Sequence, residues 1–415
     1  MRKVTKSPLR GSCLISEEFK NFMIKTAAVI GTGVMGTQIA ELLSESGLQV
    51  MLLTARSKSL ESSMRNLQRK RVGEDPNIQI GNFEDQAEKL READWIIETV
   101  VEQIEIKRSL MKKIEPIRKR DSIISTNTSG IPISQISEGF SEEFLSHFLG
   151  THFFNPLKHL KLLEIVPGVK TLPSVAQFIQ NFASNNLGRM TVISKDVPGF
   201  IANRIGAFTV GLTLKTAVEQ GLNAGEVDEL TGKIIGRPKS ATFRTLDMVG
   251  MENFVRVAQY LYDSLPYDPM REYFKVPDFM LQMAENQKSG VKTKEKFYKR
   301  MTREDGKSEI FSLDLKTQEY VPAAQSPEFS SLYKAKAQNN IEEGIKWLAR
   351  GEDKASNFFK KTTKGLVDYA ADIALEIADS KTSLDQAAKW GFGWELGPFE
   401  MWDILHSLSL EKDFS

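Results

Sequence analysis

Of the four histidines in the chain, His152 stands in the setting that best suits acid–base chemistry. It lies in the motif GTHFFNP at residues 150–156, at the expected end of a strand, where open α/β sheets bind their ligands. Imidazole can accept a hydroxyl proton because its pKa lies near neutrality. Glu164, twelve residues later, could bond the second ring nitrogen, fix the tautomer and raise the basicity of the ring. The pair predicts a general base with an orienting carboxylate, and separate structural roles are the alternative that these two residues alone leave open.

A glycine-rich segment, AAVIGTGVMG at residues 27–36, could bind the pyrophosphate of a dinucleotide. Gly31 permits a tight turn, Gly33 lets the backbone approach a phosphate, and Gly36 lets a helix pack on a strand. The N-terminus of that helix would face the anion. Because the motif stands between an apolar run and an amphipathic one, it predicts the first turn of a Rossmann domain. The expected cofactor contacts in this turn are Gly31, Gly33, Val34, Met35 and Gly36.

The end of the second expected strand bears on which dinucleotide the domain prefers. An acidic residue about 20 positions after the glycine loop normally binds the adenosine ribose of NAD. Thr54 stands there instead, followed by Arg56 and Ser57, which could bind the 2′-phosphate of NADP. We expect NAD, with Thr54 and Arg56 as contacts, and keep NADP as the alternative. With His152 as the base, such a cofactor suits the oxidation of an alcohol, in which a hydride leaves for the nicotinamide.

The elements that must position these residues alternate in βαβ order from residue 25 to about residue 194, which is typical of a parallel sheet covered by helices. The expected strands are TAAVI, LQVMLLT, DWIIETVV, DSIISTN, FLGTHFF, LKLLEIV and MTVIS. After VPGF at residues 197–200, helical periodicity takes over. The expected fold is therefore an α/β Rossmann domain, with a doubly wound and mainly parallel sheet, followed by an all-α substrate domain with two helical repeats.

Changes in pattern along the chain set the expected domain boundaries. Residues 1–24 read as an N-terminal extension, 25–196 as the NAD-binding domain, 197–301 as the first helical repeat, 302–330 as a polar, strand-poor linker, and 331–415 as the second repeat. The segments ATFRTLD at 241–247 and GPFEMWD at 397–403 both place Phe and Asp four residues apart at a helix start. This echo suggests a duplicated helical unit, and two ordinary helix starts are the alternative.

The composition indicates a small-molecule partner in a reducing compartment. Lys and Arg number 55 against 54 Asp and Glu, for a net charge of +1, so neither nucleic acid nor an anionic membrane is expected as the main partner. Cys13 is the single cysteine, which excludes an intrachain disulfide and a cysteine-based metal site. No apolar run approaches the roughly 20 residues of a membrane span. We expect a cytoplasmic protein without a metal site.

Several motifs together resemble the L-3-hydroxyacyl-CoA dehydrogenase family. They are, in order, STNTSG at 125–130, HFFNP at 152–156 with Glu164 behind it, KDVPGFIANR at 195–204, RPKSATFRTLDMVGM at 237–251 and KWGFGWELGPFEMWDIL at 389–405. The resemblance covers nearly the whole chain after residue 24. GNFED at 81–85 and ADWIIETVVE at 93–102 most resemble the dehydrogenase half of bacterial and archaeal enzymes that fuse it to an enoyl-CoA hydratase.

The resemblance implies an NAD-dependent enzyme that reversibly oxidises a (3S)-hydroxyacyl-CoA in fatty-acid β-oxidation. It implies that His152 is the general base, that Glu164 orients it, that Ser129 bonds near the substrate hydroxyl, and that Asn203 positions the thioester. Further cofactor contacts are implied for Glu102, Lys107, Asn155 and Lys292. We expect an acyl-CoA substrate, a monomer or weak homodimer, and association with an enoyl-CoA hydratase or thiolase.

The sequence departs from the family pattern at two single residues and in one segment. Thr54 replaces the usual Asp, Gly130 replaces a second Ser, and VKTKEKFY at 291–298 replaces a glycine-rich KTGxGFY segment. The base, its carboxylate, Ser129 and Asn203 all remain, which favours activity. Two alternatives stay open: a non-catalytic dinucleotide- or acyl-CoA-binding remnant of a fused enzyme, and a dehydrogenase of another hydroxy acid.

Overall fold

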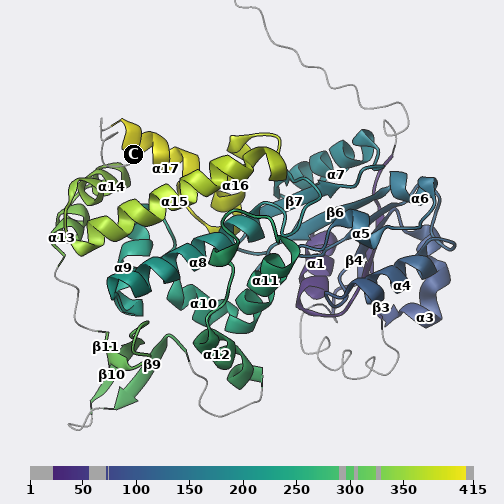
Figure 1. The fold of residues 1–415 in the computed structure, drawn as a ribbon. Helices are drawn as coiled ribbons and strands as arrows, with labels where there is room; N and C mark the ends of the chain where they lie inside the picture. Colours follow the sequence, from purple (N-terminus) through teal and green to yellow (C-terminus); the bar gives the residue numbers. More distant parts are fainter. Residues whose placement is uncertain are drawn as a thin grey trace, which may run out of the picture.

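The computed structural model describes residues 22–55, 72, 74–288, 296–302, 307–323 and 329–407, without the side chains of residues 287 and 288. Arg56 and Lys292, two of the expected cofactor contacts, lie outside the described residues, as does Cys13. The described chain forms a sheet domain and a largely helical region that lie side by side (Figure 1).

The sheet domain is built on one eight-stranded sheet with the order β3-β2-β1-β4-β5-β6-β7-β8. Its strands are β1 (Thr26–Ile30), β2 (Gln49–Thr54), β3 (Ile78–Asn82), β4 (Trp95–Glu98), β5 (Ile123–Thr126), β6 (Phe148–Phe153), β7 (Leu162–Pro167) and β8 (Met190–Ile193). Neighbouring strands pair in parallel except β6 and β7, which are antiparallel. The predicted mainly parallel α/β sheet is confirmed. Of these eight strands, only β3 is not among the expected ones, because its short sequence, IQIGN, mixes polar and apolar residues around a glycine.

Helices cover both faces of this sheet, which explains why its central strands read as continuous apolar runs. They are α1 (Val34–Glu45), α3 (Phe83–Gln86), the 3-10 helix η4 (Ala87–Glu92), α4 (Ile104–Ile114), α5 (Ile133–Ile136), α6 (Glu142–Ser146) and α7 (Pro173–Asn185). Residues 27–30 of β1 are completely buried as a result. The carboxyl ends of the parallel strands form one edge, and many residues of the candidate site lie at these strand ends or in the loops that follow them.

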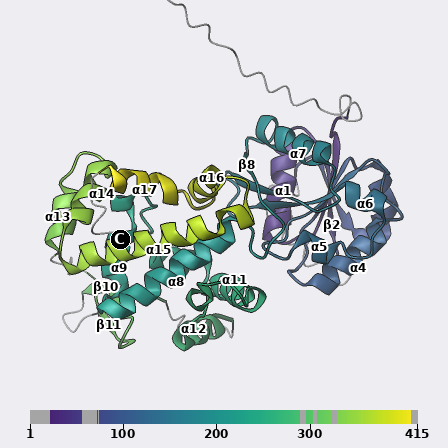
Figure 2. The ribbon, with the colours of Figure 1, turned by 45° about the horizontal axis from the view of Figure 1, so that its top comes forward.

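The helical region begins at α8 (Ala202–Gln220), as the change in periodicity predicts. It continues with α9 (Ala224–Thr231), η5 (Lys233–Ile235), α10 (Phe243–Val249), α11 (Met251–Ser264), η6 (Arg271–Tyr273), α12 (Asp278–Lys288), α13 (Ser330–Lys336), α14 (Ile341–Arg350), α15 (Lys354–Ile377), α16 (Lys381–Phe392) and α17 (Pro398–His406). Two long helices, α8 and α15, pack along each other and form its centre (Figure 2).

The segment between the two helical units contains strands, so the prediction that residues 302–330 are strand-poor is wrong. Strands β9 (Tyr298–Thr302), β10 (Ser308–Leu313) and β11 (Tyr320–Pro322) form an antiparallel sheet in the order β11-β10-β9. Most of β9 and β10 is exposed or half-buried, and burial is complete only at the end of β10. These strands carry too few apolar side chains for their sequence to show a β pattern.

The two helical units share a helix-capping device, which supports the duplication that the sequence echo suggests. In the first unit, Asp228 of α9 accepts backbone hydrogen bonds from the start of α10, including one of 2.7 Å from Phe243 N. In the second unit, Asp385 of α16 accepts a hydrogen bond of 2.9 Å from Phe399 N at the start of α17. Burial raises the pKa of each of these carboxyl groups to about 6.

The second helical unit also contacts the sheet domain directly. Lys195, just after β8, donates a backbone hydrogen bond of 2.9 Å to the carbonyl of Ile377 at the end of α15. Helix α16 packs on β7 and β8, and a Cβ built on Gly391 would lie 2.7 Å from Cδ2 of Leu162. Glycine therefore lets α16 approach the strand that carries Glu164.

Candidate active site

His152 and Glu164 lie opposite each other on the antiparallel strands β6 and β7. The distance from His152 Nδ1 to Glu164 Oε2 is 2.7 Å. Glu164 is completely buried, and the exposed fraction of His152 is 5%. The twelve-residue spacing thus corresponds to a strand, a turn and a return strand, which brings the two side chains together.

The second oxygen of Glu164 caps the helix that starts the helical region. Its Oε1 accepts hydrogen bonds from the backbone nitrogens of Ile201, at 3.1 Å, and Ala202, at 2.8 Å. The chain reaches this position through Gly199 and Phe200, which both have positive φ angles, of 76° and 51°. Because both carboxylate oxygens accept, Nδ1 of His152 must donate, and this assignment of the tautomer leaves Nε2 as the acceptor. The capping role of Glu164 has no signal in the sequence, because it depends on how the two regions meet.

Asn203 and Ser129 lie together where the start of α8 meets the loop after β5. Asn203 donates a hydrogen bond of 2.6 Å from Nδ2 to the carbonyl of Ser129. Gly199 N donates to the carbonyl of Gly130 at 3.1 Å, and a Cβ built on Gly130 would lie 3.1 Å from the backbone of Gly199. The departure at Gly130 is therefore explained by the close approach of two backbones between the sheet domain and α8.

Glu102 is tied to the same loop and to Lys107. Its Oε1 accepts hydrogen bonds from Ser129 N, at 2.7 Å, and from the hydroxyl of Thr128, at 2.6 Å, while its Oε2 lies 3.2 Å from Lys107 Nζ. Burial by itself would raise the pKa of Glu102, but the charge of Lys107 and these hydrogen bonds lower it below its ordinary value. The site therefore holds a carboxylate beside Ser129 at neutral pH.

Lys107 is buried, with an exposed fraction of 1%, and its ammonium is fully occupied. Besides Glu102, it donates to both oxygens of Glu98, at 3.0 and 3.1 Å. Burial would lower the pKa of Lys107, but Glu98 and Glu102 raise it above its ordinary value. With three donors and three acceptors, the ammonium of Lys107 has no donor left for a ligand, and it holds the carboxylate of Glu102 in place.

Glu98 is a residue that the sequence analysis missed. It is completely buried at the end of β4, and it also accepts hydrogen bonds from Thr126, at 2.6 Å, and from Val100 N, at 2.6 Å. A glutamate that ends an apolar strand at the ligand-binding edge is a signal that could have found it. Glu98 fixes Lys107, and Lys107 in turn fixes Glu102.

The glycine loop has the geometry that a bound dinucleotide needs. Gly31 has a φ angle of 126°, and a Cβ built on Gly36 would lie 1.8 Å from the carbonyl oxygen of Gly31. A Cβ built on Gly33 would meet no atom within 4 Å, and no side chain caps the N-terminus of α1. The space and the free N–H groups fit a pyrophosphate. Val34 is exposed, whereas Met35 packs against the apolar core.

Thr54 and Asn155 lie at the ends of β2 and β6. Thr54 is buried, with an exposed fraction of 2%, opposite Asn82 of β3. Asn155 Oδ1 accepts a hydrogen bond of 2.9 Å from Gln38 of α1, which leaves the amide nitrogen of Asn155 as a donor beside the glycine loop's helix. Both are on the edge that the strand ends form, together with the His152 site.

The fold and site define a dinucleotide-binding domain joined to a helical region, with a His–Glu pair where the two meet. The model for the NAD-binding domain of 3-hydroxyacyl-CoA dehydrogenases matches residues 26–197, and the model for the C-terminal domain of these enzymes matches residues 199–300. The chain belongs to the 3-hydroxyacyl-CoA dehydrogenase family and carries its NAD-binding domain. The resemblance that the motifs indicate is confirmed.

Individual relatives extend this similarity over most of the chain. A probable 3-hydroxyacyl-CoA dehydrogenase of Bacillus subtilis is 42% identical over 92% of this chain and 51% of its own length. A putative fatty acid oxidation complex trifunctional enzyme of Rickettsia felis is 30% identical over 92% of this chain and 53% of its own length. The chain thus spans about half the length of these two relatives.

A solved structure shows the same fold. The crystal structure of 3-hydroxybutyryl-CoA dehydrogenase from Escherichia coli covers 95% of this chain and 97% of its own, with a TM-score of 0.66 and 19% identity. Within the described residues, no helix is long and apolar enough to cross a membrane.

Proposed function

We propose that this chain is an NAD-dependent L-3-hydroxyacyl-CoA dehydrogenase that interconverts (3S)-hydroxyacyl-CoA and 3-oxoacyl-CoA in fatty-acid β-oxidation. The observation that carries the proposal is the 2.7 Å contact between His152 Nδ1 and Glu164 Oε2, at the edge of a family-matched NAD-binding domain. A buried pair of this kind, with its free ring nitrogen unprotonated, supports a general base.

The chemistry assigns separate paths to the proton and the hydride. His152 Nε2 accepts the proton of the 3-hydroxyl, and the electrons of the O–H bond form the C3 carbonyl. NAD, when bound, accepts the hydride that leaves C3. Glu164 stabilises the positive charge that the imidazole gains. In the reverse direction, the same ring returns the proton to the oxygen.

The other residues orient the two reactants. Ser129 bonds near the substrate oxygen, and Asn203, held against the Ser129 carbonyl at 2.6 Å, positions the thioester end. Glu102 binds the nicotinamide ribose, with its carboxylate held by Lys107 and Thr128. Asn155 offers a further donor to the cofactor.

NAD, rather than NADP, is the cofactor that we propose. The chain carries the NAD-binding domain of the family, and Thr54 stands at the end of β2 where a carboxylate is usual. Arg56 and Lys292 remain proposed contacts outside the described residues.

The proposal extends to partners and location. We infer an acyl-CoA substrate, a cytoplasmic location, and association with an enoyl-CoA hydratase or thiolase, which the twofold greater length of the matched relatives supports. We infer a monomer or weak homodimer, because the packing of α8 on α15 already pairs two helical units within one chain. The domain boundaries at 25–196, 197–301, 302–330 and 331–415 are part of the same proposal.

Steady-state assays of NADH and NADPH oxidation, with acetoacetyl-CoA and with free acetoacetate, test the proposal. We expect turnover with NADH and acetoacetyl-CoA, and much lower turnover with NADPH or the free acid. Binding of NADH without any turnover would support the non-catalytic alternative. Turnover with NADH and free acetoacetate instead of the thioester would support a dehydrogenase of another hydroxy acid.

A further inference from the structure

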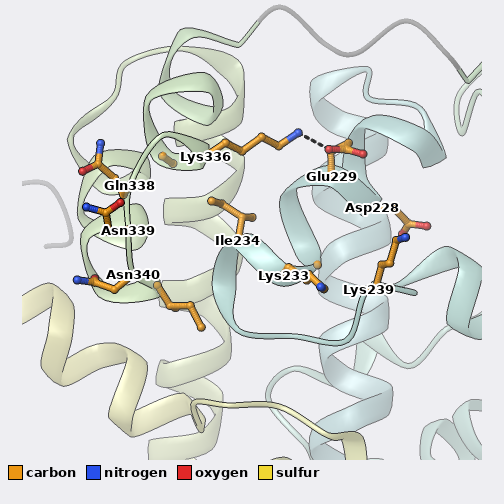
Figure 3. A pocket seen from close by; sticks show the side chains of 12 residues that line it. Asp228, Glu229, Lys233, Ile234, Lys239, Lys336, Gln338, Asn339 and Asn340 are labelled. Carbon is orange, nitrogen blue, oxygen red and sulfur yellow. Dashed lines mark hydrogen bonds and ion pairs between the residues drawn. The ribbon is translucent and has the colours of Figure 1, made fainter.

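Two features of the helical region lie outside the residues described so far. One is a cavity of about 430 Å³ between the two helical units. Figure 3 shows the amides of Asn339 and Asn340 pointing away from the lysines of the facing wall, so the polar side chains of this cavity do not converge on one ligand. The other feature is the flank of α11 that faces the loop after β5, and this flank borders the candidate active site.

Helix α11 is packed directly on the turn that leads into α8. A Cβ built on Gly199 would lie 2.6 Å from Cδ2 of Leu261, and Leu261 is completely buried. Because residue 199 is a glycine, the leucine side chain can rest on the backbone. Gly199 in turn donates a backbone hydrogen bond of 3.1 Å to the carbonyl of Gly130. These two contacts fix the position of α11 relative to the loop after β5.

Tyr260, the neighbour of Leu261 on α11, lies against that loop. A Cβ built on Gly130 would lie 3.5 Å from Cε1 of the half-buried Tyr260. The ring therefore stands one residue along the loop from Ser129. The hydroxyl of Ser129 forms no hydrogen bond with any residue that the structure describes, so it remains available to a ligand. The ring of Tyr260 thus borders the space in which that ligand would lie.

The charges around the phenol place it near the residue that we assign to the nicotinamide ribose. Burial raises the pKa of Tyr260, a hydrogen bond with Ser264 opposes this increase, and the negative charges of Glu102 and Asp196 add to it. The phenol is therefore neutral at pH 7. Its ring offers an apolar surface on the helical side of the place where substrate and nicotinamide would meet.

We propose that the ring of Tyr260 is the wall of the acyl site on the helical side and limits the length of the acyl chain. This inference rests on the proposed function, because it takes Ser129 as the residue beside the substrate oxygen. The ring bridges the space between α11 and Gly130, so it packs on the first carbons beyond C3 and opposes further ones. A single methylene that a pocket accepts or rejects changes affinity by about tenfold or more.

Calorimetric titration of the full chain, saturated with NADH, tests this assignment with two acyl-CoAs that lack a 3-oxo group and cannot react. The probes are butyryl-CoA and octanoyl-CoA, and the measured quantity is the dissociation constant for butyryl-CoA divided by that for octanoyl-CoA. In Tyr260→Ala this ratio should rise by at least about tenfold over the wild type, because the short chain loses a contact and the long chain gains space. Tyr260→Phe keeps the ring and should retain the wild-type ratio. Tyr260→Leu, which is intermediate in size, should give an intermediate ratio even if the alanine variant does not fold.

The matched control is Tyr262→Ala on the same helix. The ring of Tyr262 lies under the guanidinium of Arg271, at 3.8 Å, so its removal should leave the ratio unchanged. An unchanged or lower ratio in the Tyr260 variants, an equal rise in Tyr262→Ala, or no binding of either acyl-CoA to the wild type would overturn the assignment. Reduction of acetoacetyl-CoA by the wild type is measured separately. Its absence would contradict the proposed function, whereas the ratio of dissociation constants needs no turnover and tests Tyr260 alone.

Discussion

The carboxylate of Glu164 determines which nitrogen of His152 is free to act. One oxygen accepts from Nδ1, and the other accepts from two backbone N–H groups of α8. An amide in place of this carboxylate could keep the helix cap only by turning its NH2 group toward the ring. His152 would then carry its proton on Nε2 and could not act as a base.

Glu164→Gln should therefore reduce kcat by about 10²- to 10⁴-fold, while the dissociation constant for NADH stays within about twofold of the wild-type value. Acetoacetyl-CoA reduction and fluorescence titration with NADH measure the two quantities. A variant with nearly normal kcat would show that the carboxylate does not set the tautomer.

Glu98 also influences a residue that it does not contact, because it holds Lys107, which in turn holds Glu102. Removing its charge leaves Lys107, which is 1% exposed, with Glu102 as its single carboxylate partner. We expect Glu98→Gln to lower the free energy of unfolding by about 3 kcal/mol and to raise KM for NADH more than it lowers kcat.

Urea denaturation and initial rates check this prediction, with Glu88→Gln as the matched control. Glu88 forms an exposed ion pair with Arg91, so its substitution should cost less than about 1 kcal/mol. Equal effects of the two substitutions on the free energy of unfolding would contradict the structural role assigned to Glu98.

At the scale of elements, two glycines of the turn between β1 and α1 are expected to have different roles, one in packing and the other in cofactor binding. Gly36 is packed against Gly31, whereas Gly33 faces open space with a φ angle of −71° that alanine can adopt. Gly33→Ala should leave the melting temperature unchanged but weaken NADH binding by at least about tenfold, because the methyl group fills the space for the pyrophosphate.

Gly36→Ala is the companion variant and should lower the melting temperature, since its Cβ would lie 1.8 Å from the carbonyl oxygen of Gly31. Differential scanning calorimetry and NADH titration distinguish the two outcomes. Tight NADH binding by Gly33→Ala would contradict the assignment of the loop.

The buried helix-capping aspartates predict that the free energy of unfolding depends on pH. Asp385 is 7% exposed, and burial raises its pKa from 3.8 to about 6. Between about pH 4 and 6 the folded state therefore holds more protons than the unfolded state, so this group makes the protein less stable as the pH rises. Asp385→Asn keeps an acceptor for Phe399 N but does not ionise.

The free energy of unfolding of Asp385→Asn, relative to the wild type, should increase between pH 4 and 7 by as much as about 3 kcal/mol. Denaturation curves at several pH values measure this difference. A difference that does not change with pH would mean that the carboxyl group titrates alike in the folded and unfolded chains.

At the scale of the whole molecule, the two helical units and the sheet domain pack within one chain. Helix α15 lies along α8 (Figure 2). Helix α16 packs against β7, the strand that carries Glu164, and against β8. We expect sedimentation equilibrium to give a mass near 46.7 kDa at micromolar concentration. A stable dimer would show that this internal pairing leaves an interface open.

The sequence predicts most of this architecture because long apolar strands and the glycine loop carry strong local signals. Seven strands follow from such patterns, whereas the pairing of His152 with Glu164 is implied by the family resemblance, since the two residues alone leave separate structural roles open. Glu98, the capping role of Glu164 and the sheet of β9, β10 and β11 do not follow from local patterns, because each depends on contacts between segments that are distant in the chain or on strands with few apolar residues.

The central claim is that His152 is the general base of an NAD-dependent oxidation, and His152→Ala tests it most directly. We predict that kcat/KM for acetoacetyl-CoA reduction falls by about 10²- to 10⁴-fold, while NADH binding and the melting temperature stay close to wild type. His147→Ala, which removes a histidine on the same domain outside the site, should retain full activity. Turnover by His152→Ala equal to that of the wild type would contradict the account.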